Sequence, residues 1–350
     1  MGLFILRRTG VMILTAICLT FIVFFLTNLY PNLEKLAKTE GNFRMSDEAV
    51  ASWLDKNGYL QPVAVKYGQW LGVLPGWRAE TEEGITGRCI DGPVSAEAAA
   101  QAPRFCGVIQ GDWGYSTRFK DGVWSIIKVR LANTGYLMMW VLIVMVPTAL
   151  LIGVLAGMRE GSVTDRSLST ASILTTATPE YVSGVIFIAV FTSATVGLKW
   201  FKGTATSAMT EPTFENFFLP VITIALYGIG YIARMTRASM TEVMTAQYIR
   251  TARLKGVSFP NIVLRHALRN ALIAPFTVIM LQFPWLLSGV VIVETLFNYK
   301  GFGWSLVEAA GNNDIELLLG ISVISVVIVL LTQLISDIGY VYLNPRIRIN

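Results

Sequence analysis

The chain has 350 residues, of which 53% are hydrophobic and only 15% are charged. Soluble domains carry about 25% charged residues, so this composition excludes an ordinary soluble protein and favours a lipid environment for much of the chain. The formal net charge is +5, but the basic residues cluster beside apolar runs, a pattern typical of the cytoplasmic ends of membrane helices rather than of a nucleic-acid-binding surface. One histidine and three cysteines are little material for a metal site, and we predict none.

The first apolar run covers residues 9–30 and follows Arg7 and Arg8. A helix needs about 20 predominantly apolar residues to cross a bilayer. A secretory signal peptide is the alternative, but its apolar core is about 7–15 residues long and precedes a small-residue cleavage site. This run is longer and ends in Asn-Leu-Tyr-Pro at residues 28–31. We therefore predict a retained membrane anchor over residues 9–30, preceded by a cytoplasmic leader of residues 1–8.

A polar segment rich in glycine and proline covers residues 31–132, and we expect it to lie outside the membrane. Five further apolar runs follow it, at residues 133–157, 170–195, 216–236, 271–296 and 317–340. Several contain proline or glycine, which a membrane helix tolerates when neighbouring helices satisfy the freed backbone groups. The expected fold is all-α, a polytopic membrane protein with six transmembrane helices, five of them in a core of residues 133–350.

The short loops between the runs set the expected orientation. Residues 234–270 hold seven arginines and lysines against the single acid Glu242, whereas residues 297–316 hold one lysine against three acids. By the positive-inside rule the first segment is cytoplasmic and the second lies on the opposite side. Six crossings then place the N and C termini in the cytoplasm and residues 31–132 in the bacterial periplasm.

In the periplasm two of the cysteines could form a stable disulfide, because disulfides persist in that compartment and rarely in the cytosol. We predict that Cys89 and Cys106 pair. The alternative is two free thiols. Cys18, inside the first apolar run, is interpreted as packing.

The cytoplasmic loop of residues 237–270 has a distinct layout. A short helix is predicted from residue 247 to 255 and stops at Gly256, a residue type that suits a left-handed helix end. Ser258 is placed to cap the next helix, with Pro260 in its first turn. That helix is expected to run through His266 and to enter the fifth span near Leu272.

Apolar residues occur among the basic ones in this loop, at positions 248, 249, 254, 257 and 259. An ordinary positive-inside loop explains the arginines equally well. It does not explain two helices around a glycine with apolar side chains exposed, and a surface of that kind indicates a protein partner.

The loop resembles the EAA loop of B-type permease subunits in the oligopeptide, dipeptide and nickel family of ATP-binding-cassette (ABC) importers. The runs Tyr-Ile-Arg-Thr-Ala-Arg-Leu-Lys-Gly at residues 248–256 and Arg-His-Ala-Leu-Arg-Asn-Ala-Leu at residues 265–272 fit the peptide version. Arg250, Thr251, His266 and Arg269 depart from the general consensus in the way that is typical of the peptide branch.

Weaker likenesses occur in the expected order along nearly the whole chain, at residues 1–8, 111–116, 293–297, 300–303, 337–340 and 344–347. Residues 76–110 have no counterpart and look like an insertion. That insertion contacts a substrate-binding protein, covers an outer gate, or is neutral, and the sequence does not choose among these.

The resemblance implies a type I ABC importer permease with short cytoplasmic helices that dock into a groove on an ATPase subunit. The residues expected to form this coupling site are Tyr248, Arg250, Ala252, Arg253, Lys255, Gly256, Val257, Phe259, Arg265 and His266. The implied partners are a homologous second permease, two cytoplasmic ATPase subunits that bind ATP and Mg²⁺, and a periplasmic substrate-binding protein, with no nucleic acid. This chain itself is expected to be a transport subunit in the inner membrane, without enzymatic activity or a bound cofactor, in keeping with its lack of a GxxxxGK[ST] phosphate loop.

Peptides are the expected substrate, because they dominate this branch, while nickel chelates, glycosides and opines stay open. Two other classes remain as alternatives. An ATP-independent secondary transporter or channel would need intramembrane charges for ion coupling. A membrane-anchored structural or assembly protein would not need the docking loop.

Three polar residues inside the predicted spans are candidates for the pathway or a gate, because polar groups at membrane depth are costly. Glu180 is expected near the middle of the third span, either lining the pathway or bonded to Thr176 or Thr178 as a structural group. Gln282 and Glu294 lie on the fifth span, and Glu294 is a candidate for a gate or for pairing with a partner permease.

Overall fold

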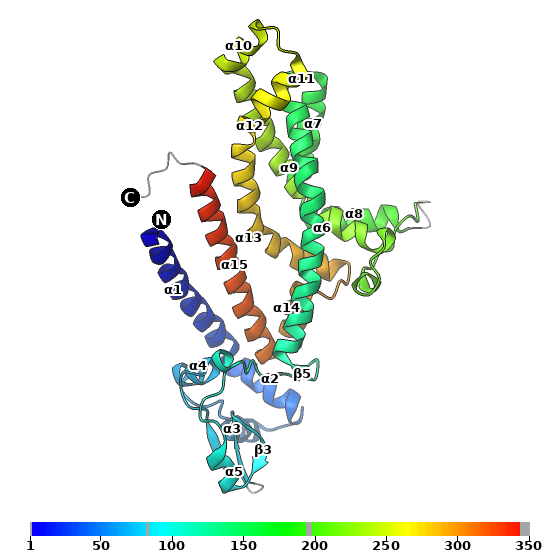
Figure 1. The fold of residues 1–350 in the computed structure, drawn as a ribbon. Helices are drawn as coiled ribbons and strands as arrows, with labels where there is room; N and C mark the ends of the chain where they lie inside the picture. The colour runs from blue at the N-terminus through cyan, green and yellow to red at the C-terminus, as the bar shows by residue number, and fades with distance from the viewer. Residues whose placement is uncertain (1, 82–83, 194–197, 344–350) are drawn as a thin grey trace. The chain divides into compact units, whose positions relative to one another are not determined.

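The computed structural model describes residues 2–81, 84–193 and 198–343, and most of them are helical (Figure 1). The chain divides into two compact units. Unit 1 contains residues 1–6, 130–304 and 329–350, and unit 2 contains residues 7–129 and 305–328. The C-terminal likeness at residues 344–347 lies outside the described residues.

Unit 2 contains the first apolar run and the long polar segment. Its helices are α1 (Gly2–Thr27, which begins in unit 1), α2 (Tyr30–Glu40), α3 (Asp47–Lys56), α4 (Val63–Leu71) and α5 (Ala96–Gln101), with a 3-10 turn at Val108–Gln110. An antiparallel sheet has the order β1 (Arg78–Thr81), β2 (Gly84–Gly87) and β3 (Ile90–Val94), and β4 (Tyr115–Ser116) pairs with β5 (Asp121–Gly122). The polar segment is therefore a folded domain with small sheets, which the helical expectation did not include.

A hydrophobic core joins these short helices. Its buried members include Phe24 of α1, Leu36 of α2, Leu54 of α3 and Trp70 of α4. Asp314, which is fully buried, adds a polar link: it accepts hydrogen bonds from the Ser116 hydroxyl at 2.5 Å and from the Arg118 amide at 3.1 Å. The link fixes the turn after residues 111–116 against the start of α15 (Ile315–Leu343).

The predicted pairing of Cys89 with Cys106 is confirmed. The two residues form a disulfide with their Cα atoms 5.6 Å apart and 17 positions apart in sequence. Both lie in the stretch of residues 76–110, so the bond closes the loop that contains β3 and α5.

Replacing Cys89 and Cys106 with serine is expected to lower the local stability of residues 76–110 by about 3 kcal/mol, because the open loop gains chain entropy. Hydrogen exchange followed by mass spectrometry would report faster exchange there, and Cys18→Ser should leave the exchange unchanged. A non-reducing tryptic digest should contain one cross-linked peptide. Two separately alkylated cysteines would contradict the disulfide.

Unit 1 is a helical assembly. Its helices are α6 (Val123–Gly157), α7 (Val163–Ala177), α8 (Glu180–Phe191), α9 (Phe214–Thr245), α10 (Gln247–Leu254), α11 (Phe259–Asn261), α12 (Leu268–Ala271) and α13 (Ile273–Leu296), with a 3-10 turn at Thr206–Met209 and a π-helix at Ile262–Ala267. Helix α14 (Phe302–Gly311) and helices α6 and α15 contribute residues to both units. Within unit 1, α7 lies beside α9, and α10 and α11 follow the end of α9 (Figure 1).

Small residues let α6 approach α9 closely. A Cβ atom at Gly153 would lie 2.6 Å from the Ala233 carbonyl oxygen, and one at Gly157 would lie 2.7 Å from the Arg237 carbonyl oxygen. Two glycines four positions apart form the small-residue spacing that allows membrane helices to pack backbone against backbone.

Four helical stretches are long and apolar enough to cross a membrane: Leu6–Thr27, Val123–Gly157, Phe214–Thr245 and Ile315–Gly339. Two further candidates are bent pairs, α7 with α8 at 103°, and Phe259–Ala271 with Ile273–Gln282 at 49°. The described helices therefore give four to six candidate spans.

The third predicted span, residues 170–195, does not form one straight helix. Figure 1 shows α8 leaving α7 at a steep angle. The break falls at Thr178, whose backbone is extended (φ −94°, ψ 118°) immediately before Pro179. A residue that precedes proline disfavours the helical conformation, and proline has no N–H to donate, so the bend has a local cause.

Candidate functional site

The predicted coupling loop is built around a small buried apolar cluster. Ile249 of α10 is completely buried and Ala252 is 7% exposed, and both pack with Met240 of α9 and with Ile262 and Val263 of the π-helix. Val257 and Phe259 are partly buried against the same cluster. The expectation that Ile249 would be exposed is wrong, because residues three positions apart share one face of a helix and that face is turned inward.

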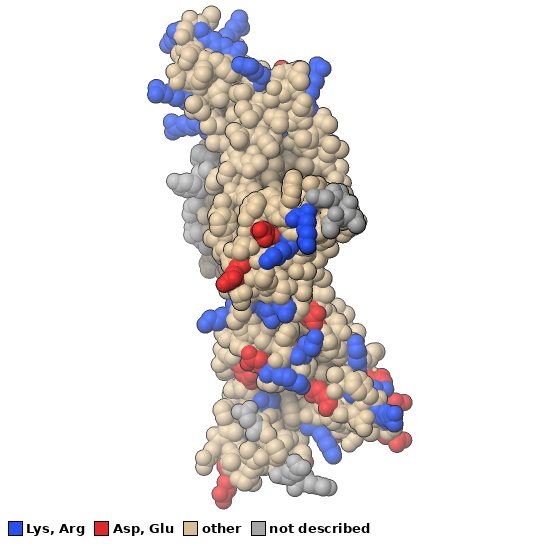
Figure 2. Space-filling model, turned by 90° about the vertical axis from the view of Figure 1, so that its right-hand side faces the viewer, with Lys and Arg blue, Asp and Glu red and all other residues tan. Residues whose placement is uncertain are grey.

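The opposite face of α10 and residues 264–266 of the π-helix are exposed, and most of their side chains are basic. Leu254 is 83% exposed, Leu264 64% and Tyr248 43%. Around them lie the exposed residues Arg250, Arg253, Lys255, Gly256, Arg265 and His266. Figure 2 shows basic side chains gathered at the top of the view, where this loop lies. We call these nine residues the loop surface. The exposure of Leu264 is not predictable from the sequence, because it depends on the π-helix.

The turn between the two helices matches the prediction from the sequence only in part. Gly256 has a φ of +74°, the left-handed conformation expected at that helix end. Ser258 occupies the N-cap position but its side chain makes no capping hydrogen bond. The segment that follows is a π-helix rather than a continuous α-helix, and it contains Arg265 and His266. Single π-helical turns are frequent at functional sites.

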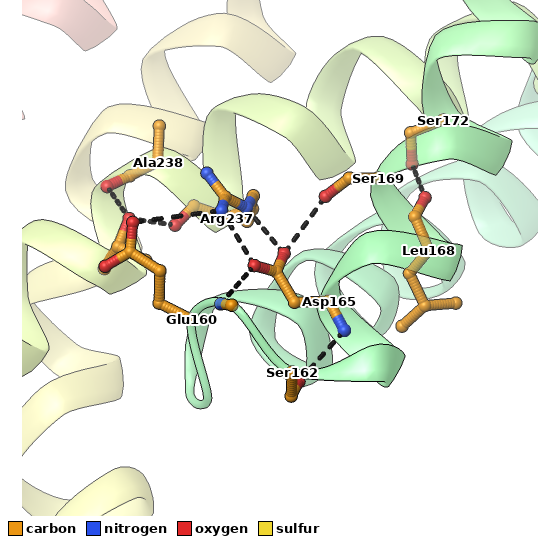
Figure 3. A network of polar contacts seen from close by, with 10 residues as sticks. Glu160, Ser162, Asp165, Leu168, Ser169, Ser172, Arg237 and Ala238 are labelled. Carbon is orange, nitrogen blue, oxygen red and sulfur yellow. Dashed lines mark hydrogen bonds and ion pairs between the residues drawn. The ribbon is translucent and has the colours of Figure 1, made fainter.

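An ion pair between a buried carboxylate and a partly exposed guanidinium connects α7 and α9 (Figure 3). Asp165 of α7 is 2% exposed, and Arg237 of α9 donates to its two carboxylate oxygens at 2.7 and 2.8 Å. Asp165 also accepts from the Gly161 amide at 2.9 Å, while Ser162 caps α7 by accepting from the Asp165 amide at 3.1 Å. Two parallel N–H···O bonds make this the geometrically strongest type of ion pair.

Asp165 is not among the residues predicted from the sequence, and Arg237 is one of the seven basic residues of segment 234–270. The available signal was Ser162 followed three positions later by an acid, the pattern that starts a helix. A further contact holds the loop: the Arg159 guanidinium lies over the Phe259 ring, 5.4 Å from its centroid. The Asn270 side chain donates to the Tyr248 hydroxyl at 3.0 Å.

Glu180 is the first residue of α8 rather than a residue in the middle of a helix. Its half-exposed carboxylate forms no hydrogen bond or ion pair with another residue that the structure describes. The Thr176 and Thr178 hydroxyls donate instead to carbonyl oxygens of α7. A helix N-terminus favours a carboxylate, because the free backbone N–H groups there carry partial positive charge.

The two candidates on α13 differ. Glu294 is fully buried inside unit 1, where it accepts hydrogen bonds from the Thr134 hydroxyl and, at 2.9 Å, from the Trp304 amide. A carboxylate in that position is enclosed by its own chain. Gln282 is 7% exposed, and its Nε2 has no hydrogen-bond partner among residues 2–81, 84–193 and 198–343.

Comparison with known proteins agrees with this architecture. The family model described as the binding-protein-dependent transport system inner membrane component matches residues 149–349. A probable peptide ABC transporter permease protein, y4tP of Sinorhizobium fredii, is 30% identical over 348 residues, which cover 99% of this chain and 100% of the relative.

Two further relatives cover similar lengths. The oligopeptide transport system permease protein AppB of Bacillus subtilis is 29% identical over 99% of this chain and 100% of its own length. The dipeptide transport system permease protein DppB of Escherichia coli is 28% identical over 99% of this chain and 98% of its own length. The family match covers more than half of the chain, and the relatives match it from end to end. The chain therefore belongs to the binding-protein-dependent transport system inner membrane component family and resembles the permeases of peptide ABC transporters within it.

Proposed function

We propose that this chain is the transmembrane permease subunit of an ABC importer that moves peptides across the bacterial inner membrane. The observation that carries the proposal is the loop surface, in which basic and apolar side chains are exposed on two short helices that pack on a buried apolar cluster. The similarity to peptide permeases supports peptides as the cargo.

The proposed assembly contains a second permease, two ATPase subunits that bind ATP and Mg²⁺, and a periplasmic binding protein. Each bent pair counts as one span, so that six spans place both termini and the loop surface in the cytoplasm. Residues 31–132 then lie in the periplasm, where the disulfide persists. No cofactor is assigned to this chain.

The loop is built to transmit motion. A displacement of α10 by an ATPase would reach α9 through the cluster around Ile249 and Met240, and α7 through the Arg237–Asp165 pair. Rigid packed elements transmit small shifts because a close-packed interior deforms little. Glu180 and Gln282 are the proposed pathway residues, since both present polar groups that their own chain leaves without a described side-chain partner.

The test of the assembly is purification of this chain from its native membranes in a mild detergent, with its companions identified and counted by mass spectrometry. Recovery of ATPase subunits and a second, similar permease is the expected result. Recovery of this chain alone, or only as copies of itself, would favour an ATP-independent carrier.

Replacing Leu254 with aspartate is expected to abolish recovery of the ATPase subunits and to leave folding unchanged, because the side chain is 83% exposed. A buried charge at a protein interface typically costs several kcal/mol. Phe43→Asp is the matched control, since Phe43 is 78% exposed in unit 2. Equal loss in both variants, or undiminished recovery with Leu254→Asp, would contradict docking through the loop surface.

A further inference from the structure

Two adjoining hollows lie within unit 2, with volumes of about 200 and 550 Å³. They share lining residues, among them Glu40, Tyr59, Arg88 and Glu316. Small-molecule sites are typically concave, with an apolar wall and a few converging polar groups. We call the joined hollows the unit 2 pocket.

One wall of the pocket is aromatic. Trp53 of α3, Trp70 of α4 and Trp77, just before β1, all line the smaller hollow. The wall requires a glycine: Gly58 has a φ of +72°, and a Cβ atom there would lie 2.6 Å from the Trp77 ring. The Trp53 ring stacks on Tyr59 with centroids 6.0 Å apart. The wall therefore combines helices α3 and α4 with the stretch of residues 76–110.

Arg88 lines both hollows and is an incompletely paired base. The Arg88 side chain is 15% exposed and its Nη1 lies 3.8 Å from Oε1 of Glu316, beyond hydrogen-bond distance. The buried Nε of Arg88 has no hydrogen-bond partner among the residues that the structure describes. The other basic residue that lines the pocket, Lys66, already has a partner, because its ammonium donates to the Asn28 side chain at 3.1 Å. Buried polar groups normally have partners, so Arg88 has a donor available for a ligand oxygen.

Acidic residues line the larger hollow. Glu40, the exposed last residue of α2, lines this hollow together with Asp112. Glu316 lines it as well, beside Arg88, and its buried Oε2 has no hydrogen-bond partner among the described residues. Neither the Glu40 nor the Asp112 carboxylate forms an ion pair with another residue that the structure describes. Partial burial raises the pKa of Glu40, which the charge of Lys120 counteracts and the carboxylates of Asp314 and Glu316 reinforce. A carboxylate in such surroundings gains stability from a cation.

We propose that the unit 2 pocket binds a small zwitterion with an apolar side chain, of the amino acid or short peptide class. Its ammonium group lies at Glu40 and Asp112, a carboxylate or carbonyl oxygen accepts from Arg88, and its side chain lies against Trp53 and Trp77. This inference goes beyond the proposed import function, because it assigns a binding site to unit 2, which contains neither of the pathway candidates Glu180 and Gln282.

The test uses the full chain in lipid nanodiscs and the dipeptide Ala-Phe, with binding measured by calorimetry at neutral pH. Saturable binding is expected. Glu40→Gln and Arg88→Met should each weaken it at least about tenfold, because a charge-assisted contact is lost. Glu34→Gln, on the same helix but outside the pocket, and Arg104→Met, in the same stretch as Arg88, are the matched controls and should bind like the original chain. N-acetyl-Ala-Phe, which lacks the ammonium group, should bind at least about tenfold more weakly.

Absence of saturable binding, equal affinity for the acetylated peptide, or undiminished binding by Glu40→Gln would overturn the proposal. Should Arg88→Met fail to fold, Glu40→Gln decides, because Glu40 is exposed. Binding that is lost with Glu180→Gln but kept with Glu40→Gln would place the peptide in the pathway and reject the pocket. That outcome would leave the import function standing, and failure to recover ATPase subunits would leave the pocket standing.

Discussion

Replacing Arg237 with methionine is expected to lower the apparent free energy of unfolding by about 3–5 kcal/mol. Arg237 donates two hydrogen bonds to Asp165, whose side chain is almost completely buried. Methionine keeps an apolar stem but leaves the carboxylate with only the Gly161 amide and the Ser169 hydroxyl, at 2.9 and 3.1 Å. The cost arises because a buried charge loses its opposing charge.

The measurement is a denaturant titration in detergent micelles, followed by tryptophan fluorescence. Arg234→Met is the matched control: it lies one turn earlier on α9, is exposed, and its one described hydrogen bond is a 3.3 Å contact with Thr176. The double variant Asp165→Asn with Arg237→Met should recover part of the loss, since it removes the isolated charge. Equal losses for Arg234→Met and Arg237→Met would show that the Arg237–Asp165 pair contributes nothing specific to the free energy of unfolding.

Replacing Gly301 with alanine is expected to cost about 3 kcal/mol, through overpacking and through displacement of buried hydrogen bonds. A Cβ atom there would lie 2.1 Å from Oε1 of Glu294 and 2.5 Å from the Thr134 hydroxyl. The Thr134 hydroxyl also accepts from the Phe302 amide at 2.7 Å. One added methyl group therefore displaces the whole arrangement that fixes the turn after α13.

Gly311 supplies the matched control, because a Cβ atom there would meet nothing within 4 Å. Gly311→Ala is expected to leave the same unfolding transition nearly unchanged. Glu294→Leu should imitate Gly301→Ala, since it removes the acceptor for both Thr134 and the Trp304 amide, whereas Glu294→Gln retains one acceptor and should cost less. A Gly301→Ala variant as stable as Gly311→Ala would refute this account.

Features that depend on a few neighbouring residues were predictable. The apolar runs at 216–236 and 317–340 lie within the continuous helices α9 and α15. Gly256 ends its helix in the left-handed conformation, because it is the residue type without a Cβ penalty there. The bend at Pro179 also has a local signal in the sequence, the proline itself, although residues 170–195 are apolar enough to predict one straight span.

The position of the candidate site in the chain was predictable, but which of its side chains are exposed was not. Helical periodicity located the loop, but only the packed structure shows that Ile249 is buried while Leu254 and Leu264 are exposed. Similarly, the sequence marks Glu294 as an acid within an apolar run, whereas only the structure shows that Thr134 and the turn at Gly301 enclose it.

The sequence by itself determined the helical class, the apolar runs, the family resemblance and the cysteine pair, because composition, period and motif are properties of short stretches. Only the tertiary structure decided which polar groups meet. Asp165 and Arg237 are 72 residues apart, and Thr134 and Glu294 are 160 apart. Such pairs cannot be predicted from the order of residues along the chain. A buried charge is stabilised by a partner that the packing of distant helices brings within hydrogen-bond distance.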